Sequence, residues 1–146
     1  MSTKLYEKMN VYLANQQVSY IKLHNLHWYV KGRSFFTLHA KLEELYDATA
    51  NVIDDVAERL LALDQKPVAN LKGALAMATI KELEDGPIAS EDTVKSLIKD
   101  MEYWIKDTKE IVDLADEAGD GATADMFNDY LAQYQKNMWM LKSYIG

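Results

Sequence analysis

The sequence predicts an all-α protein, a four-helix bundle with one long connection in the middle of the chain. Helix-breaking residues are scarce, since the 146 residues include only 2 Pro and 6 Gly. Apolar residues recur with helical period along four long segments, and the pattern is interrupted between the second and the third. A chain of this length can bury its own core, so we expect residues 1–146 to form a single domain.

The first predicted helix covers residues 3–30 and the second covers residues 36–63. Gly32 is expected to lie in the turn that ends the first helix, and Pro67 lies beyond the end of the second. The apolar stripe of the second helix consists of Leu38, Leu42, Leu45, Thr49, Val52, Ile53, Val56, Leu60 and Leu63.

A long connection follows over residues 64–89. Residues 71–80 are predicted to form a short helix within it, and Gly86-Pro87 marks a turn. A connection of this length is typical of a crossover, which would make the flanking helices parallel.

The third helix is predicted to begin near Ser90, a favourable N-cap, and to break at Gly119 and Gly121. The fourth is predicted over residues 123–144, with Trp139 in its core-facing set.

Composition and charge limit the classes of function. The formal net charge of −7 disfavours tight binding to phosphate backbones and attracts cations. Cysteine is absent, which excludes disulfides and thiolate ligands. No apolar run is long enough for a membrane span, and the first residues do not resemble a signal peptide, so we expect a cytoplasmic protein with no membrane partner.

The second predicted helix contains a polar stripe with metal-ligand chemistry. On a helical wheel with His39 at 0°, Glu43 lies at about 40°, Asp54 at about 60° and Glu58 at about 100°. The apolar stripe lies at roughly 220° to 340°, so these side chains face away from the core of their own bundle.

The four residues form two half-sites, because His39 and Asp54 are about 22 Å apart along the axis. A second copy of the helix, antiparallel and crossing near residues 48 and 49, would bring His39 and Glu43 of one chain opposite Asp54 and Glu58 of the other. The small residues on or near this stripe, which permit close approach, are Ala40, Ala50 and Ala57. Nitrogen and oxygen ligands without sulfur suit iron, and zinc can occupy the same set. The same pattern also fits a solvated acidic face with no metal.

Three blocks of sequence resemble the Dps family, the mini-ferritins named for DNA protection in starved cells. The blocks are His24-Asn25-Leu26-His27-Trp28-Tyr29-Val30-Lys31-Gly32, Phe35-Phe36-Thr37-Leu38-His39-Ala40-Lys41-Leu42-Glu43-Glu44-Leu45-Tyr46, and Asp54-Asp55-Val56-Ala57-Glu58-Arg59-Leu60-Leu61. Pro67-Val68 is similar too, and the spacing between the blocks also matches. The resemblance implies a ferritin-like fold in a dodecameric shell.

The resemblance also implies an activity and a ligand set. It implies a ferroxidase that oxidises Fe(II), with hydrogen peroxide or O₂, and stores the ferric mineral. His27, His39 and Glu43 would come from one subunit, and Asp54 and Glu58 from its twofold partner; the family has Asp or Glu where Glu43 stands.

Three aspartates and one tryptophan receive further candidate roles. The resemblance assigns Asp116, Asp120 and Asp125 to a threefold pore, although helix capping and solubility explain them equally simply. Trp28 is a candidate for packing at the dimer interface or for a redox-protective role.

Two features that the sequence lacks concern a metal site inside one bundle and DNA binding. The sequence has no Glu-x-x-His motif, which argues against a di-iron site inside one bundle. No Lys-rich tail is present, so DNA binding is expected to be weak. The alternatives are a DNA-condensing nucleoid protein with the shell as scaffold, and a metal-independent helical interaction module.

Overall fold

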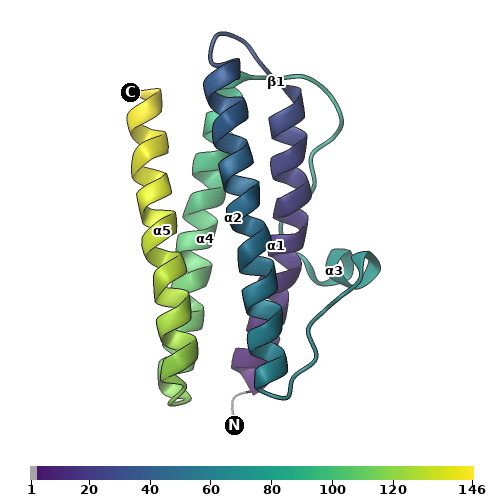
Figure 1. The fold of residues 1–146 in the computed structure, drawn as a ribbon, viewed down its shortest axis with the longest axis vertical. Helices are drawn as coiled ribbons and strands as arrows, with labels where there is room; N and C mark the ends of the chain where they lie inside the picture. The colour runs from purple at the N-terminus through teal and green to yellow at the C-terminus, as the bar shows by residue number, and fades with distance from the viewer. Residues whose placement is uncertain (1–2) are drawn as a thin grey trace. The chain divides into compact units, whose positions relative to one another are not determined.

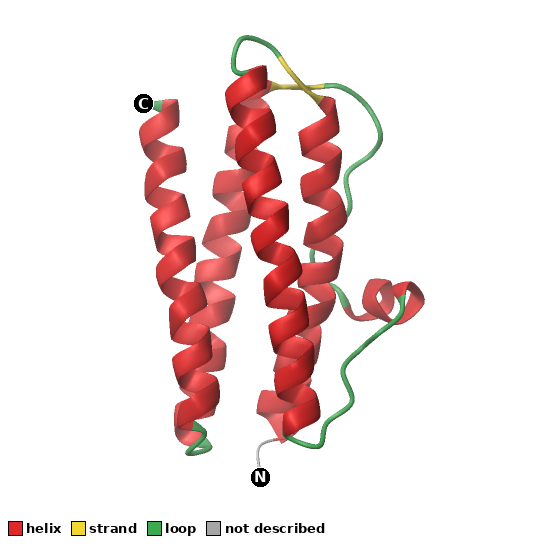
Figure 2. Cartoon of the chain, viewed as in Figure 1, coloured by secondary structure: helices red, strands yellow, loops and turns green. Residues whose placement is uncertain are grey.

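The computed structural model describes residues 3–146, and it is almost entirely helical (Figures 1 and 2). Its elements in chain order are α1 (Thr3–Tyr29), β1 (Val30–Lys31), α2 (Phe35–Ala62), α3 (Leu71–Met77), β2 (Ile88–Ala89), α4 (Ser90–Glu117) and α5 (Gly121–Ile145). The all-α prediction with a short helix in the long connection is therefore confirmed. Among the helices of residues 3–146, none is both long and apolar enough to span a bilayer.

The described chain falls into two compact units. One covers Tyr6–Ser90, and the other combines the first turn of α1 with Glu91–Gly146. In the first unit α1 and α2 are antiparallel neighbours, since Tyr20 contacts Tyr46 while His27 contacts His39 (Figure 1). The buried residues of α2 all belong to the predicted stripe, and they are Leu38, Leu42, Leu45, Thr49, Val52, Val56 and Leu60. The two other members of that stripe are not buried, since Ile53 is half-buried and Leu63 is half-buried just beyond the end of the helix. The opposite face of α2 is thereby left exposed.

Asparagine side chains of α1 hydrogen-bond to the backbone of the long connection. The Asn10 carboxamide donates to the Lys66 carbonyl and accepts from the Val68 amide at 2.8 Å. Asn15, which is fully buried, accepts from the backbone amides of Thr79 and Ile80 at 2.8 and 2.9 Å. These bonds explain how α1 can bury the polar side chain of Asn15.

The same bonds explain a difference from the predicted short helix. We expected this helix over residues 71–80, but it ends at Met77. Ala78 already has extended backbone, and the next two amides donate to Asn15 instead of continuing the helical ladder. A buried partner on α1 therefore sets the end of α3.

A short parallel strand pair, which the sequence did not predict, joins the end of α1 to the start of α4. Val30 pairs with Ile88 and Lys31 with Ala89. The predicted start of this helix near Ser90 is confirmed, but Ser90 is its first helical residue and not its N-cap, and the Ser90 hydroxyl donates to the Lys31 carbonyl at 2.8 Å. Gly32 has φ +115°, and a Cβ there would lie 2.9 Å from the Ser90 Oγ, so this turn requires glycine.

The second unit is a helical hairpin of α4 and α5. The rings of Trp104 and Tyr134 stack at 5.8 Å between the two helices. The Asp120 carboxylate caps α5, accepting from the Thr123 amide at 3.1 Å. The placement of Trp139 in the core is wrong, because 65% of this residue is exposed, whereas the neighbouring Met138 is buried.

Candidate metal centre

One histidine near the end of α1 and one near the start of α2 form a stacked pair. The imidazole centroids of His27 and His39 are 3.6 Å apart, and the rings are inclined by 14°. The Nδ1 of His27 lies 2.7 Å from the His39 carbonyl oxygen, and the Nδ1 of His39 lies 2.7 Å from the His27 carbonyl oxygen. Each histidine therefore positions the other through its own backbone.

This reciprocal bonding decides where the protons lie. A carbonyl oxygen only accepts hydrogen bonds, so both Nδ1 atoms must be donors. In the neutral rings the Nε2 atoms then hold the lone pairs, the form in which histidine binds a metal. Metal-binding histidines usually have their second nitrogen held in this way, because the outer hydrogen bond fixes the tautomer and the ring orientation.

Aromatic rings enclose the pair on both sides. Phe35 stacks against His39 at 5.0 Å with an inclination of 23°. Tyr46 meets His27 edge-on at 5.2 Å. His27 itself is buried, with 5% of its surface exposed, and His39 is half-buried. The two imidazoles are thus held in the order Phe35, His39, His27, Tyr46.

A second aromatic group continues from Tyr46 toward the surface. His24 stacks on Tyr46 at 3.8 Å, and its Nδ1 donates to the Tyr20 carbonyl at 2.8 Å. The His24 ring also lies 5.2 Å from that of Trp28. Desolvation, followed by the negative charges of Glu43 and Asp47, raises the pKa of Tyr46 above the ordinary tyrosine value. The Tyr46 phenol therefore stays protonated at neutral pH.

The predicted carboxylate ligands lie on the exposed face of α2. Glu43, Asp54 and Glu58 are all exposed, as the helical wheel predicted. Within residues 3–146, no three His, Asp or Glu side chains of the one chain converge on a common point. The single chain thus brings His27 and His39 together but leaves Asp54 and Glu58 at the other end of the helix.

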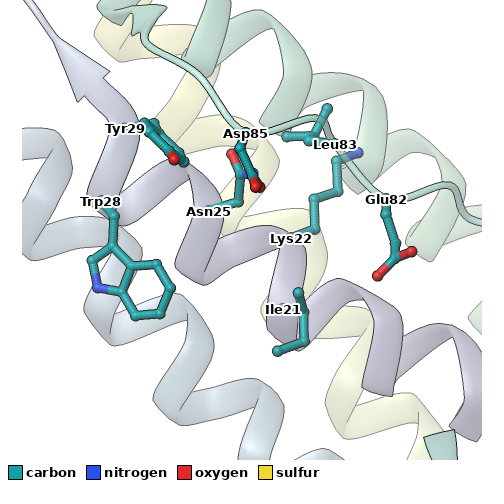
Figure 3. Close-up of a pocket in the computed structure, with 8 residues that line it drawn as sticks. All are labelled: Ile21, Lys22, Asn25, Trp28, Tyr29, Glu82, Leu83 and Asp85. Carbon is teal, nitrogen blue, oxygen red and sulfur yellow. The ribbon is translucent and has the colours of Figure 1, made fainter.

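Trp28 and the proposed pore residues occupy different surroundings. Trp28 is 66% exposed and borders a pocket between α1 and the segment 82–85 (Figure 3). Asp116 and Asp125 are exposed. Asp120 uses its carboxylate to cap α5, which is the alternative to the pore role given above.

Phe35 and Tyr46 were not identified from the sequence as parts of this centre. A signal was present, because Phe35 lies one helical turn before His39 and Tyr46 lies two turns after it. Both positions also fit an apolar stripe, and the contact of Tyr46 with His27 depends on the packing of α1 against α2.

Comparison with known proteins first defines the class. A family model described as a ferritin-like domain matches residues 6–146. The helical order, the long connection with its short helix and the histidine pair therefore occur in a chain of the ferritin-like class.

More similar proteins define the family. The chain is 49% identical to general stress protein 20U of Bacillus subtilis over the whole of both chains. It is 39% identical to DNA protection during starvation protein 2 of Bacillus anthracis, covering 100% of this chain and 99% of that one. A Dps structure from Vibrio cholerae, titled as a member of the ferritin-like diiron-carboxylate proteins, superposes with a TM-score of 0.93 at 36% identity, covering 99% of this chain and 91% of that one. The chain belongs to the Dps family.

Proposed function

We propose that this protein is a ferroxidase and iron-storage protein whose metal centres are shared between two subunits. The observation that supports this best is the reciprocally bonded pair of His27 and His39. Two buried or half-buried imidazoles with free Nε2 atoms are a prepared nitrogen half-site. Membership of a family with a diiron-carboxylate relative points to iron as the substrate.

The carboxylates complete the centre only across a twofold axis. Glu43, Asp54 and Glu58 are exposed and His39 is half-buried, and all four lie on one side of the helical wheel of α2, with His39 about 22 Å from Asp54 along the helix. An antiparallel partner helix that crosses near residues 48 and 49 brings His39 and Glu43 of each chain opposite Asp54 and Glu58 of the other. The dimer then contains two equivalent metal centres. The protein would therefore act as a homo-oligomer, and the family suggests a dodecameric shell that holds the mineral.

The residues have distinct roles in the proposed reaction. His27 and His39 bind Fe(II) through Nε2, while Asp54 and Glu58 of the partner subunit offset the rising charge as Fe(III) forms. With peroxide, two Fe(II) ions each lose one electron, and H₂O₂ with two protons accepts both to give two water molecules. O₂ is the alternative electron acceptor, and zinc would compete for the same ligands without being oxidised.

The test compares Fe(II) oxidation by the assembled protein and by an Asp54→Ala/Glu58→Ala variant. Anaerobic protein receives Fe(II) and then H₂O₂, and ferric absorbance is followed. We expect fast oxidation by the wild type and a rate close to buffer for the variant. Glu44→Ala is the matched control, because Glu44 is exposed on the same helix but lies at about 140° on the wheel, outside the ligand stripe. Full activity in the double variant would refute the proposal.

DNA binding is the second candidate function, favoured by the name of the Bacillus anthracis relative. The net charge of −7 opposes it, because binding to DNA depends on cationic contacts with phosphates. We therefore propose that any protection of DNA comes from removal of iron and oxidant. A gel shift at about 0.15 M salt, where the Debye length is about 8 Å, distinguishes the two.

A further inference from the structure

The exposed face of α2 contains two large apolar side chains. Phe36 is 84% exposed and Leu61 is 57% exposed. On the wheel with His39 at 0°, Phe36 lies at about 60° and Leu61 at about 40°. Both therefore point in the same direction as Glu43 and Asp54. The stripe of metal ligands is thus bounded by an apolar side chain near each end of the helix.

The residues along this stripe are arranged symmetrically about one point on the helix. Phe36 and Leu61 lie at equal distances from the midpoint between Ala48 and Thr49. The other positions of the stripe pair about the same midpoint, His39 with Glu58, Ala40 with Ala57, Glu43 with Asp54, and Asp47 with Ala50. Proposed ligands thus pair with proposed ligands, Ala40 with Ala57, and one large apolar residue with another; Asp47 opposite Ala50 is the one unlike pair among these. An antiparallel pair of identical helices has this symmetry.

We propose that Phe36 packs against Leu61 of the partner subunit at both ends of the α2–α2 contact and fixes its register. This inference rests on the proposed shared centre and adds the contact that aligns it. Moving one helix by a single residue would turn its side chains by about 100° and separate the half-sites. An apolar contact just outside each ligand set opposes such a shift, because it would expose both side chains to water again.

The occupant of this face is a second copy of the chain. The paired spacing belongs to the sequence of α2 itself, so another α2 helix matches it position by position. An unrelated helix would present its own spacing to the two half-sites. The segment Phe35–Phe36 also links the contact to the centre, since Phe35 touches both Phe36 and His39.

Crosslinking tests the register directly, because the protein has no cysteine of its own. The double variant Phe36→Cys/Leu61→Cys is treated with a short bismaleimide and run on a denaturing gel. We expect a covalent dimer in high yield. Each single variant should give little dimer, since two copies of residue 36, or of residue 61, are about 37 Å apart along the paired helices.

A matched control moves one cysteine out of register. Phe36→Cys/Glu44→Cys places the second thiol about 25 Å from its expected partner, beyond the reach of the reagent. Equal crosslinking in this control, or in the single variants, would overturn the proposed contact. So would a failure of the Phe36→Cys/Leu61→Cys variant to crosslink while light scattering shows it assembled.

A charge pair provides an independent readout of the same contact. Phe36→Asp alone and Leu61→Lys alone should each lower the assembled fraction in sedimentation, and combining them should restore it. The ferroxidase assay separates this inference from the proposed function. Crosslinking without iron oxidation refutes the function and leaves the contact, whereas oxidation that depends on Asp54 and Glu58 without crosslinking refutes the contact alone.

Discussion

Replacement of Phe35 by alanine tests whether the ring stack positions the two histidines of the candidate metal centre. Phe35 lies 5.0 Å from the His39 ring, whose other face is covered by His27. Aromatic pairs of this kind contribute about 0.5–1.5 kcal/mol beyond the area they bury. If that energy holds His39 in its ligand orientation, Phe35→Ala should weaken metal binding by about 2- to 12-fold, since 1.4 kcal/mol is a factor of ten.

Calorimetry with Zn²⁺ measures this affinity without redox chemistry. The iron concentration for half-maximal oxidation should rise by a similar factor. The maximal rate should change little, because we expect Phe35 to act through His39 and not to touch iron. Phe35→Leu, which preserves much of the bulk, is the control and should show a smaller loss. Unchanged Zn²⁺ affinity in a Phe35→Ala variant of normal helicity and mass would refute the positioning role.

Three further predictions concern stability and DNA. Asn15→Ala removes the acceptor of the Thr79 and Ile80 amides, so the free energy of unfolding measured in urea should fall by about 2–4 kcal/mol. Hydrogen exchange at those two amides should become faster, and unchanged exchange would contradict this prediction. Asp120→Ala removes the cap of α5 and should cost about 1 kcal/mol, with Asp120→Asn largely restoring stability, since Asn is an equally good N-cap. The assembled protein should not shift linear DNA at about 0.15 M salt, and a shift there would show that local charge outweighs the net charge.

Most of the fold could be predicted from the sequence because it follows from helical period. The buried side of α2 agrees with its apolar stripe, and the three predicted carboxylate ligands lie on its exposed side. Two errors in the predicted helix ends occur where a distant segment supplies a hydrogen-bond partner. The Ser90 hydroxyl donates to the Lys31 carbonyl, and α3 ends early because the Thr79 and Ile80 amides donate to Asn15. Trp139 fits an apolar pattern but is exposed.

The candidate metal centre also has features that follow from one helix alone and features that need two helices to pack together. The separation of His39 from Asp54 could be derived from α2 alone, because both lie on one rigid helix whose rise is known. His27 was placed at the centre only by family resemblance, since a lone histidine on an apolar stripe is usually a core residue. Its pairing with His39 requires the end of α1 to lie beside the start of α2.

By itself, the sequence determined the four long helices and the polar stripe of α2, with its two groups of candidate ligands placed symmetrically about residues 48 and 49. These are properties of single helices, governed by the fixed rise and rotation per residue. Only the tertiary structure decided the tautomers of His27 and His39, the surroundings of Phe35 and Tyr46, and the burial of Asn15 beneath the crossover. Apart from the Phe35–His39 contact within α2, those features depend on contacts between different elements, where packing and the pairing of buried polar groups override local pattern.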